Sequence, residues 1–475
     1  MTRRQAHPSA RHGTVGQVAD TLSELAYFER ACAHVIAGWS PKITELEVKT
    51  ILGQHLSEDM EHADQLRRRY WAVTRLETRD ASVPKGWQEV MIRIDRSGST
   101  AELLTGLYLV VKRRLLGLCR DHLRDTDPIG DAHSIRVVRR IMEEEREQIR
   151  WARWAVKGLP RIEGLRRIRR DIERLWRRRH TREKVDGQEA IWRPLDRVPQ
   201  VARPTNFRRG EPGALRIVPA DPLRNPKDIG IFLHSFLNEE FATLELVSRN
   251  TYEHPDMPWQ FHLDMARHAG DEARHAMILG RLAADYGVRY GDFPIYVSSY
   301  EGQYQFEPCQ PGSKRELLWR MLLRQTFHEG LALDSIAFEI RKRKFLSQGE
   351  LARVFEFLLT DEVFHAESGL RWSRHLCGND ARRCMEERAA AHGFFVESVK
   401  RGRARFVALS PEKAVAEVRR LEKVKRQYHT ARGNRLPFQR TVNAEARKEA
   451  GFTDEEIRQV VDWGYVSFET QGAAV

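Results

Sequence analysis

The hexapeptide DEARHA at residues 271–276 returns as DEVFHA at residues 361–366, so one Asp-Glu-x-x-His-Ala pattern occurs twice in the chain. In an α-helix, side chains three positions apart project from the same face. Each copy therefore offers a carboxylate and an imidazole to one side of a helix, as bundle proteins do when they bind two metal ions. The four residues are Glu272, His275, Glu362 and His365.

A lone glutamate precedes each hexapeptide at nearly the same distance. Glu240 lies 32 residues before Glu272, and Glu329 lies 33 residues before Glu362. Two helix pairs of similar length would bring each lone glutamate to the height of its partner motif. A carboxylate-bridged dinuclear site needs one glutamate from each of two further helices. We therefore predict that Glu240 and Glu329 complete a set of six metal ligands.

Asp271 and Asp361, which begin the two hexapeptides, are predicted to support the histidines from behind. A metal-bound histidine normally donates its other ring N–H to a carboxylate. The alternative for both aspartates is an exposed helix carboxylate, and the alternative for the repeat is a surface helix on which Glu-x-x-His recurs by chance. Weaker candidates, expected to be structural or to lie behind the ligands, are Glu239, Glu245, His268 and His328.

The first half of the chain carries a weaker copy of this arrangement. EDMEHA at 58–63 matches DEARHA with Asp59 and His62, and Glu29 lies 30 residues before Asp59. The motif EEREQI supplies Glu145 and then, at the second histidine position, a glutamine.

That glutamine is Gln148, and Lys112, 33 residues before Glu145, stands where a carboxylate is expected. Glutamine is a poor ligand for iron, and an ammonium group repels a metal cation. We predict a duplicate whose metal site has decayed and whose role is structural or dimer-like.

Apolar residues recur at helical spacing along most of the chain, which predicts an all-α fold. Four long helices are expected over 15–159, with breaks near 40–42, 78–86 and 124–131, and four more over 226–377. The segment between them is too rich in proline for a helix. The predicted parts are a degenerate helical bundle at 1–159, an Arg-rich helix and Pro-rich linker or arm at 160–228, a di-metal bundle at 229–377 and a helical extension at 378–475.

The composition limits the class of protein. The five cysteines of the 475-residue chain have no Cys-x-x-Cys spacing, which argues against a disulfide framework and a zinc cluster and fits a reducing compartment. The most apolar stretch, LLTGLYLVVKRRLLGL, is interrupted by three basic residues, and we infer neither a membrane span nor a signal peptide. We expect a cytoplasmic protein with no membrane contact.

The formal net charge of +13 is unevenly distributed. Residues 161–184 contain ten arginines and one lysine against four acidic residues, a local net charge of +7. Such a segment could contact nucleic acid, or it could be a solvated helix that pairs with acidic groups of the same protein. The second interpretation is favoured, because no recognised nucleic-acid motif accompanies the arginines.

Four stretches together resemble domain-of-unknown-function family 455, a ferritin-like family: FLNEEFATLELVSRNTYEHPDMPWQF, DEARHAMILGRLAADYGVRYGDFPIY, FHEGLALDS and LTDEVFHAESGLRW. The likeness covers 226–377 and extends toward AEARKEAGF near the end. It implies a ferritin-like four-helix bundle with a dinuclear metal centre and names no substrate; the spacing of the motifs in the first half adds the expectation of a degenerate second bundle of the same kind. The implied metal ligands are Glu240, Glu272, His275, Glu329, Glu362 and His365.

Four carboxylates and two histidines neutralise two irons and leave open coordination positions, as oxygen chemistry requires. The expected cofactor is therefore two iron ions, Fe/Fe or Fe/Mn, because structural zinc prefers a closed site with Cys or His. We expect an O2-dependent oxidase or oxygenase that oxidises a C–H or N–H group of a small molecule and needs an electron donor. The loop at 288–312, rich in tyrosine, is either a lid or a packed cover.

Two other functions stay open. A di-iron hydroxylase acting on tRNA or another nucleic acid would use residues 161–184 as its basic contact. A ferroxidase or iron-handling protein would use the same six ligands. A homodimer is also left open, and neither the substrate nor the outcome of its oxidation follows from the sequence.

Overall fold

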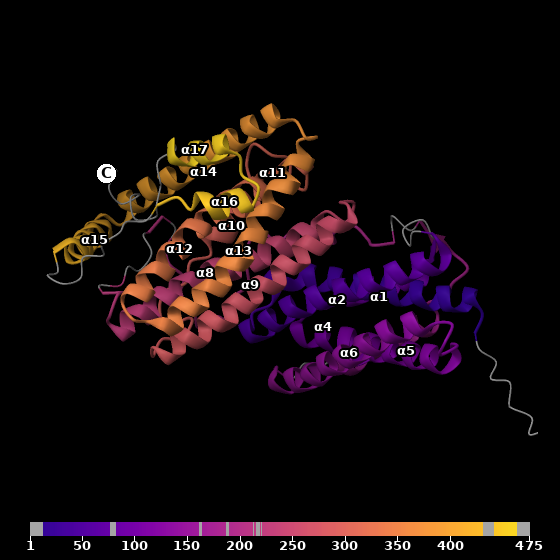
Figure 1. The fold of residues 1–475 in the computed structure, drawn as a ribbon. Coiled ribbons are helices and arrows are strands. Elements are labelled where there is room, and N and C mark those ends of the chain that lie inside the picture. The colour runs from indigo at the N-terminus through magenta and orange to yellow at the C-terminus, as the bar shows by residue number, and fades with distance from the viewer. Residues whose placement is uncertain are drawn as a thin grey trace, which may run out of the picture. The chain divides into compact units, whose positions relative to one another are not determined.

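The structure is a computed structural model that describes residues 13–76, 82–160, 164–186, 190–211, 213–214, 219, 221–430 and 441–462. These residues are mainly helical and include almost no strand, which confirms the predicted all-α class (Figure 1). Their two strands, β1 (Val83–Pro84) and β2 (Lys184–Val185), pair antiparallel over two residues each. No helix in the described part of the chain is both long enough and apolar enough to cross a membrane. The finer expectation of two four-helix bundles stays a prediction.

The chain forms two compact units that interleave along the sequence. Unit 1 comprises residues 1–43, 51–197 and 251–267, and unit 2 comprises 44–50, 198–250 and 268–475. Three long helices therefore contribute residues to both units: α2 (Leu46–Thr74), α8 (Pro226–Glu253) and α9 (Trp259–Asp285). The four-part division expected from the sequence stays a prediction.

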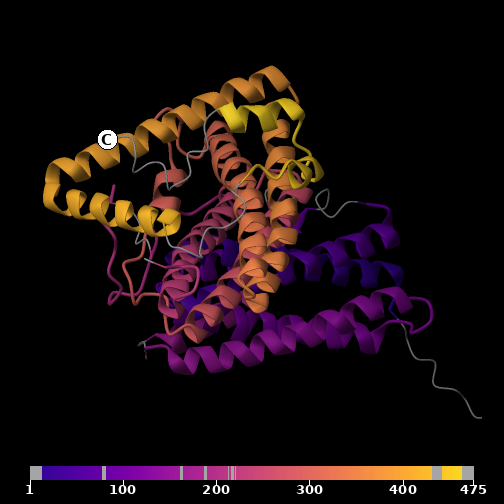
Figure 2. The same cartoon turned by 60° about the vertical axis from the view of Figure 1, so that its left-hand side comes forward.

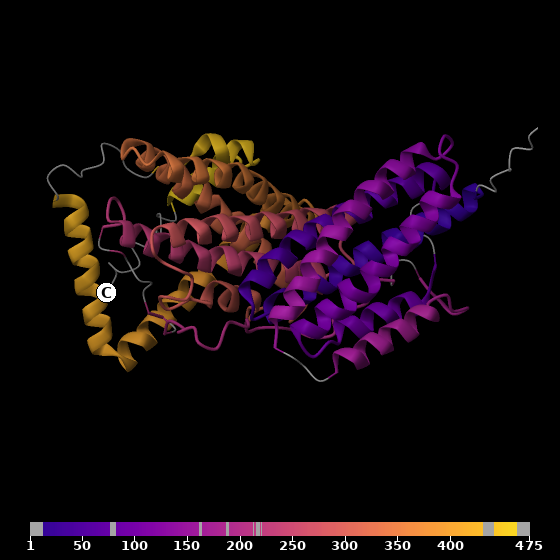
Figure 3. The same cartoon turned by 90° about the horizontal axis from the view of Figure 1, so that it is seen from below.

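Most of unit 1 consists of helices that lie side by side, coloured indigo to purple in Figure 3. The helix α1 starts with a capping box in which Thr14 and Gln17 satisfy each other's backbone N–H groups. An unexpected break separates α3 from α4, because the Ser99 side chain accepts from the backbone N–H of Glu102 and starts a new helix there. The elements are α1 (Val15–Trp39), η1 (Ser40–Lys42), α2 (Leu46–Thr74), α3 (Lys85–Asp95), α4 (Thr100–Gly106), η3 (Leu107–Lys112), α5 (Arg113–Asp125), α6 (Ala132–Gly158) and α7 (Leu165–Arg177).

Unit 2 contains the two hexapeptide helices and the helical extension. Its extension begins with a hairpin of α14 and α15, visible at the upper left of Figure 2. The short helix α16 is held on α12 by the buried Arg447, which donates to the Asp334 carboxylate at 2.7 Å. The elements are α8 (Pro226–Glu253), α9 (Trp259–Asp285), α10 (Ser298–Tyr304), α11 (Lys314–Arg320), η4 (Met321–His328), α12 (Glu329–Phe345), α13 (Gly349–Leu376), α14 (Ala381–Leu409), α15 (Pro411–Thr430), α16 (Ala444–Glu449) and α17 (Asp454–Asp462).

Each unit contains a π-helical segment inside a longer helix. The segment η3 ends at Lys112, and η4 is followed directly by Glu329. These two residues hold the same sequence position, 33 residues before Glu145 and Glu362 respectively. Because π-helices are rare and frequently mark functional sites, their recurrence beside matching positions supports a common plan for both halves.

The described residues between α7 and α8 form no helix, as their prolines predicted. Part of this segment belongs to unit 2, where Arg208 and Gly210 exchange backbone hydrogen bonds with Ile295. Tyr300 and Tyr304 of the tyrosine-rich loop are buried there too, and both bond the backbone of Val198. The loop at 288–312 is therefore a packed cover in this structure. Residues 1–12, 161–163 and 463–475, which include parts of the basic segment and of the chain ends considered above, lie outside the described residues.

Candidate metal centre

The six predicted ligands meet inside unit 2. Glu240 comes from α8, Glu329 from the first turn of α12, and the two hexapeptides lie on α9 and α13. Each hexapeptide turns its glutamate and histidine to the same helix face because they are three residues apart. None of the six residues is more than 6% exposed. The structure thus gathers residues separated by more than 120 positions into one buried cluster.

The distances show which carboxylates lie between the histidines. His275 Nδ1 is 3.3 Å from Glu240 Oε2 and 3.8 Å from both Glu272 Oε2 and Glu362 Oε1. His365 Nδ1 is 3.2 Å from Glu362 Oε2 and 3.4 Å from Glu272 Oε1. Glu272 and Glu362 therefore contact both imidazoles, which is where bridging carboxylates of a dinuclear site belong.

The cluster contains two overlapping groups that could each hold a metal ion. Within each group the ligand atoms lie within 4.8 Å of one another. Glu272 belongs to both groups, so two ions placed in them would share it. The first group is Glu240, Glu272 and His275, and the second is Glu272, Glu329, Glu362 and His365.

Asp271 and Asp361 lie behind the histidines in a crossed arrangement. Asp361 of α13 accepts from His275 Nε2 at 3.0 Å, and Asp271 of α9 accepts from His365 Nε2 at 3.4 Å. Because a carboxylate only accepts, each Nε2 carries a proton and each Nδ1 faces the cluster. Arg274 donates to both aspartates, at 2.9 and 2.6 Å, and ties the two helices together.

Burial and the neighbouring charges change the pKa values of the glutamates in the cluster. Burial, reinforced by the neighbouring Glu240, raises the pKa of Glu272 well above its ordinary value. Burial and the neighbouring Glu362 likewise raise the pKa of Glu329. Burial would raise the pKa of Glu362, but His365 and His275 together with the hydrogen bond to Glu329 outweigh it, so that pKa is lowered. Glu272 and Glu329 therefore retain protons unless a metal cation neutralises their charge.

The pKa values of the two imidazoles are raised as well. Burial alone would lower the pKa of His365, but Glu362 and Asp271 outweigh it and raise that pKa to about 9. Hydrogen bonds to Asp361 and Glu240 raise the pKa of His275 well above its ordinary value in the same manner. Protons therefore occupy the sites that a metal would take, and binding a metal releases them.

The residues fit a dinuclear metal cofactor. The donors are carboxylate oxygens and neutral imidazole nitrogens, a set that suits iron and manganese. Glu329 Oε1 is buried and has no hydrogen-bond partner among the described residues. A buried carboxylate oxygen in this state costs free energy unless a cation compensates it.

Two residues beyond the six predicted ligands also lie close to the centre. His268, expected to be structural, is fully buried one turn before Glu272 and lies 3.0 Å from its Oε1. Gln325 of η4, not noticed in the sequence, bonds His268 Nδ1 at 3.0 Å. The His-x-x-x-Glu-x-x-His spacing of α9 was the available signal for His268. No local sequence pattern predicts the contact of Gln325, because the π-helical segment η4 determines where its side chain points.

The other weak candidates lie outside the cluster. Glu239 accepts from Arg324 and from Ser299. His328 bonds the Leu323 carbonyl oxygen within its own helix. Glu245 is paired with Arg203 and Lys49.

The corresponding residues of unit 1 form a second buried cluster. The ligand atoms of Glu29, Asp59, His62 and Glu145 also lie within 4.8 Å of one another. Lys112 is fully buried among them, with its ammonium 2.8 Å from Asp59 Oδ1 and bonded to Glu145.

Lys112 supplies this cluster with a positive charge. Burial would lower the pKa of Lys112, but Asp59 and Glu145 outweigh it and raise that pKa, so the ammonium stays charged. Burial raises the pKa of Asp59 to about 6 and that of Glu145 to about 8, although Lys112 opposes both shifts. Gln148 donates to Asp59 at 3.0 Å and thus takes the place of a histidine without its basicity.

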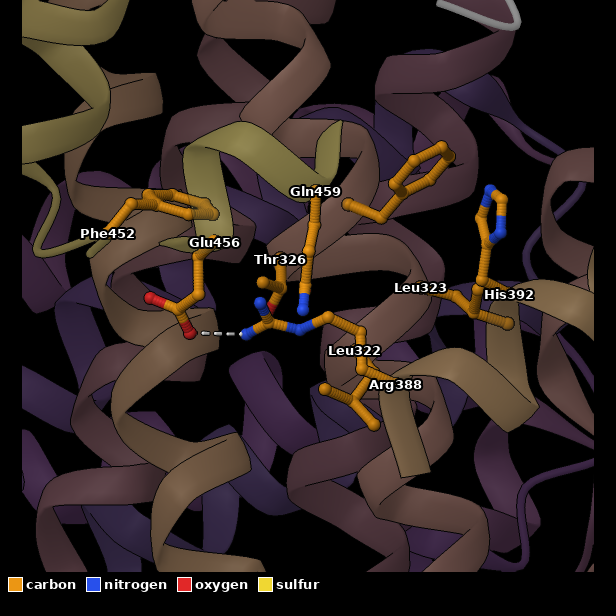
Figure 4. Close-up of a pocket in the computed structure, with 9 residues that line it drawn as sticks. Leu322, Leu323, Thr326, Arg388, His392, Phe452, Glu456 and Gln459 are labelled. Carbon is orange, nitrogen blue, oxygen red and sulfur yellow. Dashed lines mark hydrogen bonds and ion pairs between the residues drawn. The ribbon is translucent and has the colours of Figure 1, made fainter. Parts of the chain in front are cut away.

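A small cavity lies beside η4 and away from the hexapeptides. Figure 4 shows Arg388 of α14 reaching across it to Glu456, to which it donates at 2.8 Å. The cavity measures about 20 Å³, room for about one water molecule. It is too small for an organic substrate in this structure. Its lining residues are Leu322, Leu323, Thr326, Phe327, Arg388, His392, Phe452, Glu456 and Gln459.

Comparison with curated proteins and with solved structures gives no match. A family model described as a protein of unknown function, DUF455, matches residues 165–458. The match begins at α7, earlier than the resemblance seen in the sequence, and ends within α17. It includes both hexapeptides and covers more than half of the chain, so the protein belongs to the DUF455 family, whose function is unknown.

Proposed function

We propose that unit 2 is a ferritin-like four-helix bundle with a dinuclear metal centre that oxidises a small-molecule substrate with O2. The observation that carries the proposal is the pair of overlapping ligand groups that share Glu272. Two irons, or one iron and one manganese, would supply the redox chemistry that activates O2. A separate electron donor is then needed for turnover.

The protein's own side chains would have distinct tasks. Glu240 and Glu329 would each bind one ion, whereas Glu272 and Glu362 would bridge the two. Asp271 and Asp361 would hold the imidazole rings in the tautomer that presents Nδ1. Burial of the whole set excludes bulk water, which strengthens every charge interaction in the centre.

The test is metal content after anaerobic loading of the full-length protein with Fe(II), followed by O2 consumption. The expected result is about two ions per chain, with the loss of at least one ion and of O2 consumption in Glu272→Ala and His365→Ala. The matched controls are Glu367→Ala and His375→Ala, which remove a glutamate and a histidine of α13 that lie on its outer side. Both controls should retain the wild-type metal content.

Each other outcome has a clear meaning. Protein that takes up no metal after loading contradicts the proposal. More than two ions per chain means that the cluster of unit 1 also binds metal, against the expectation from Lys112. Two ions of zinc, retained in preference to iron, contradict the redox part of the proposal.

A second candidate function, oxidation of a nucleic acid, is favoured by the surface of α7. Ile168, Ile172 and Trp176 are the buried residues of this helix. Its other faces carry six exposed arginines, of which Arg169 and Arg174 pair with acids of the same helix. A row of exposed guanidinium groups provides phosphate contacts, and the experiment that tests it is given in the Discussion.

A further inference from the structure

His268 lies where a ligand of the second metal position would lie. Its side chain is fully buried, and its Nε2 is 3.0 Å from Glu272 Oε1 and 4.0 Å from Glu329 Oε1. Its ring stacks on that of His365, with centroids 3.6 Å apart and planes inclined by 12°. His268, Glu272 and His365 form a group whose ligand atoms all lie within 4.8 Å of one another.

The distances fit a shared ion better than a set of hydrogen bonds. Bonds from a metal to nitrogen or carboxylate oxygen measure about 2.0–2.2 Å, so two ligands of one ion lie roughly 3–4 Å apart. The separations of His268 Nε2 from Glu272 and Glu329 both fall in this range. The gap of 4.0 Å between His268 Nε2 and Glu329 Oε1 is too long for a hydrogen bond, and Glu329 Oε1 is buried with no hydrogen-bond partner among the described residues.

Gln325 orients His268 from the other side. Its amide lies 3.0 Å from His268 Nδ1, and the oxygen and nitrogen of an amide can exchange places by a flip. With the oxygen facing the ring, Nδ1 carries the proton and the Nε2 lone pair faces the carboxylates. The close approach of α13 to this residue depends on Gly369, because a Cβ there would lie 2.6 Å from the Gln325 backbone.

We propose that His268 is a seventh ligand, which makes the centre asymmetric. The position beside Glu329 then has two imidazoles, from His268 and His365, whereas the position beside Glu240 has only His275. Imidazole suits iron, and carboxylate suits manganese. The position beside Glu329 should therefore hold iron more tightly and discriminate more strongly against manganese. This inference rests on the proposed metal centre.

The experiment compares wild type with His268→Gln and His268→Ala, each full-length and loaded anaerobically with Fe(II) or Mn(II). Glutamine can still donate a hydrogen bond to Glu272 but cannot replace an imidazole on iron. His375→Gln is the matched control, because it removes an exposed histidine of α13. Metal content gives occupancy, and X-ray absorption with pulsed EPR counts the imidazole nitrogens bound to the metals.

The expected result is three imidazoles in wild type and two in both His268 variants, with iron bound at least tenfold more weakly at one of the two positions. Two imidazoles in wild type, or full occupancy with unchanged nitrogen couplings in His268→Gln, overturns the inference and leaves the dinuclear centre intact. Wild-type protein that binds no metal overturns both. If the variants fail to fold, the imidazole count of wild type decides by itself.

Discussion

Single residues decide how the negative charge of each buried carboxylate cluster is neutralised. In unit 2 the acids lie close to His268, His275 and His365, and one oxygen of Glu329 has no hydrogen-bond partner among the described residues. In unit 1 the matching position is Lys112, which bonds Asp59 and Glu145. A fixed ammonium in one half and a carboxylate in the other explain how similar clusters can differ in their need for a metal.

We predict that Lys112→Glu makes unit 1 dependent on a divalent ion. The substitution leaves buried carboxylates without their cation, so the free energy of unfolding should fall by about 3 kcal/mol. Mn(II) should restore part of this loss and be retained by the protein. Urea denaturation and metal analysis measure both effects, in a background of Glu272→Ala that weakens the centre of unit 2.

The control for this prediction is Lys157→Glu, which makes the same charge change at an exposed position of α6. It should alter neither stability nor metal content by much. A Lys112→Glu protein that is destabilised equally with and without Mn(II) would contradict this prediction.

His62 gives unit 1 a defined dependence on pH. Burial would lower its pKa, but hydrogen bonds to Glu144 and Glu29 outweigh it and raise the pKa to about 10 from an ordinary value of 6.5. A raised histidine pKa stabilises the folded state fully below about pH 6.5, and this stabilisation is lost as the pH rises toward 10. His62→Gln should therefore cost about 3 kcal/mol at pH 6 and progressively less from pH 7 to 10, measured by urea denaturation. A constant difference across this range contradicts the pairing.

At the scale of elements, the π-segment η4 places the side chains that no helical repeat predicts. It ends directly before Glu329 and carries Gln325, which bonds His268. The helix α13 packs against η4 at Gly369, where only a missing side chain allows the approach. Helix packing at this point thus positions both a ligand and the residue that orients another.

We predict that Gly369→Ala separates α13 from η4 and disturbs the centre. Its Cβ would lie 2.6 Å from the Gln325 carbonyl group, so the free energy of unfolding should fall by about 2 kcal/mol and metal occupancy should fall with it. Gly280→Ala of α9 is the control, because a Cβ there meets nothing within 4 Å. That variant should gain about 0.5 kcal/mol. Equal effects of the two substitutions on metal content would exclude a role for this contact.

At the scale of the whole molecule, the role of the surface positive charge distinguishes the two proposed substrates, a small molecule and a nucleic acid. If nucleic acid is the substrate, wild type should bind tRNA with an affinity that falls steeply with salt. Arg166→Gln, Arg167→Gln and Arg170→Gln together should then weaken binding and reduce the slope of log K against log[salt] by about 2 to 3. Fluorescence anisotropy at a series of salt concentrations from about 50 to about 200 mM, over which phosphate contacts weaken measurably, gives both the affinity and the slope.

The matched control replaces Arg382, Arg383 and Arg405, three exposed arginines of α14, with glutamine. If both triple variants bind tRNA alike, the contact is a general effect of net charge. If wild type itself binds no tRNA at low salt, nucleic acid is excluded and the small-molecule oxidation remains.

The sequence by itself determined the all-α class, the positions of the two hexapeptides and their partner glutamates, and the substitution of Lys112 and Gln148 in the first half. These features could be predicted because they depend on helical periodicity and on equal spacing along one chain. The resemblance to DUF455 was also visible in the sequence, and the family match extends it to residues 165–458.

Only the tertiary structure decided which side chains stand beside His268, how Asp271 and Asp361 cross between helices, and that the tyrosine-rich loop is packed. It also revealed both π-segments and the interleaving of the two units. These features depend on contacts between helices far apart in sequence, where close packing at points such as Gly369 selects the conformation. A local pattern records which face a residue occupies, but not which partner that face will meet.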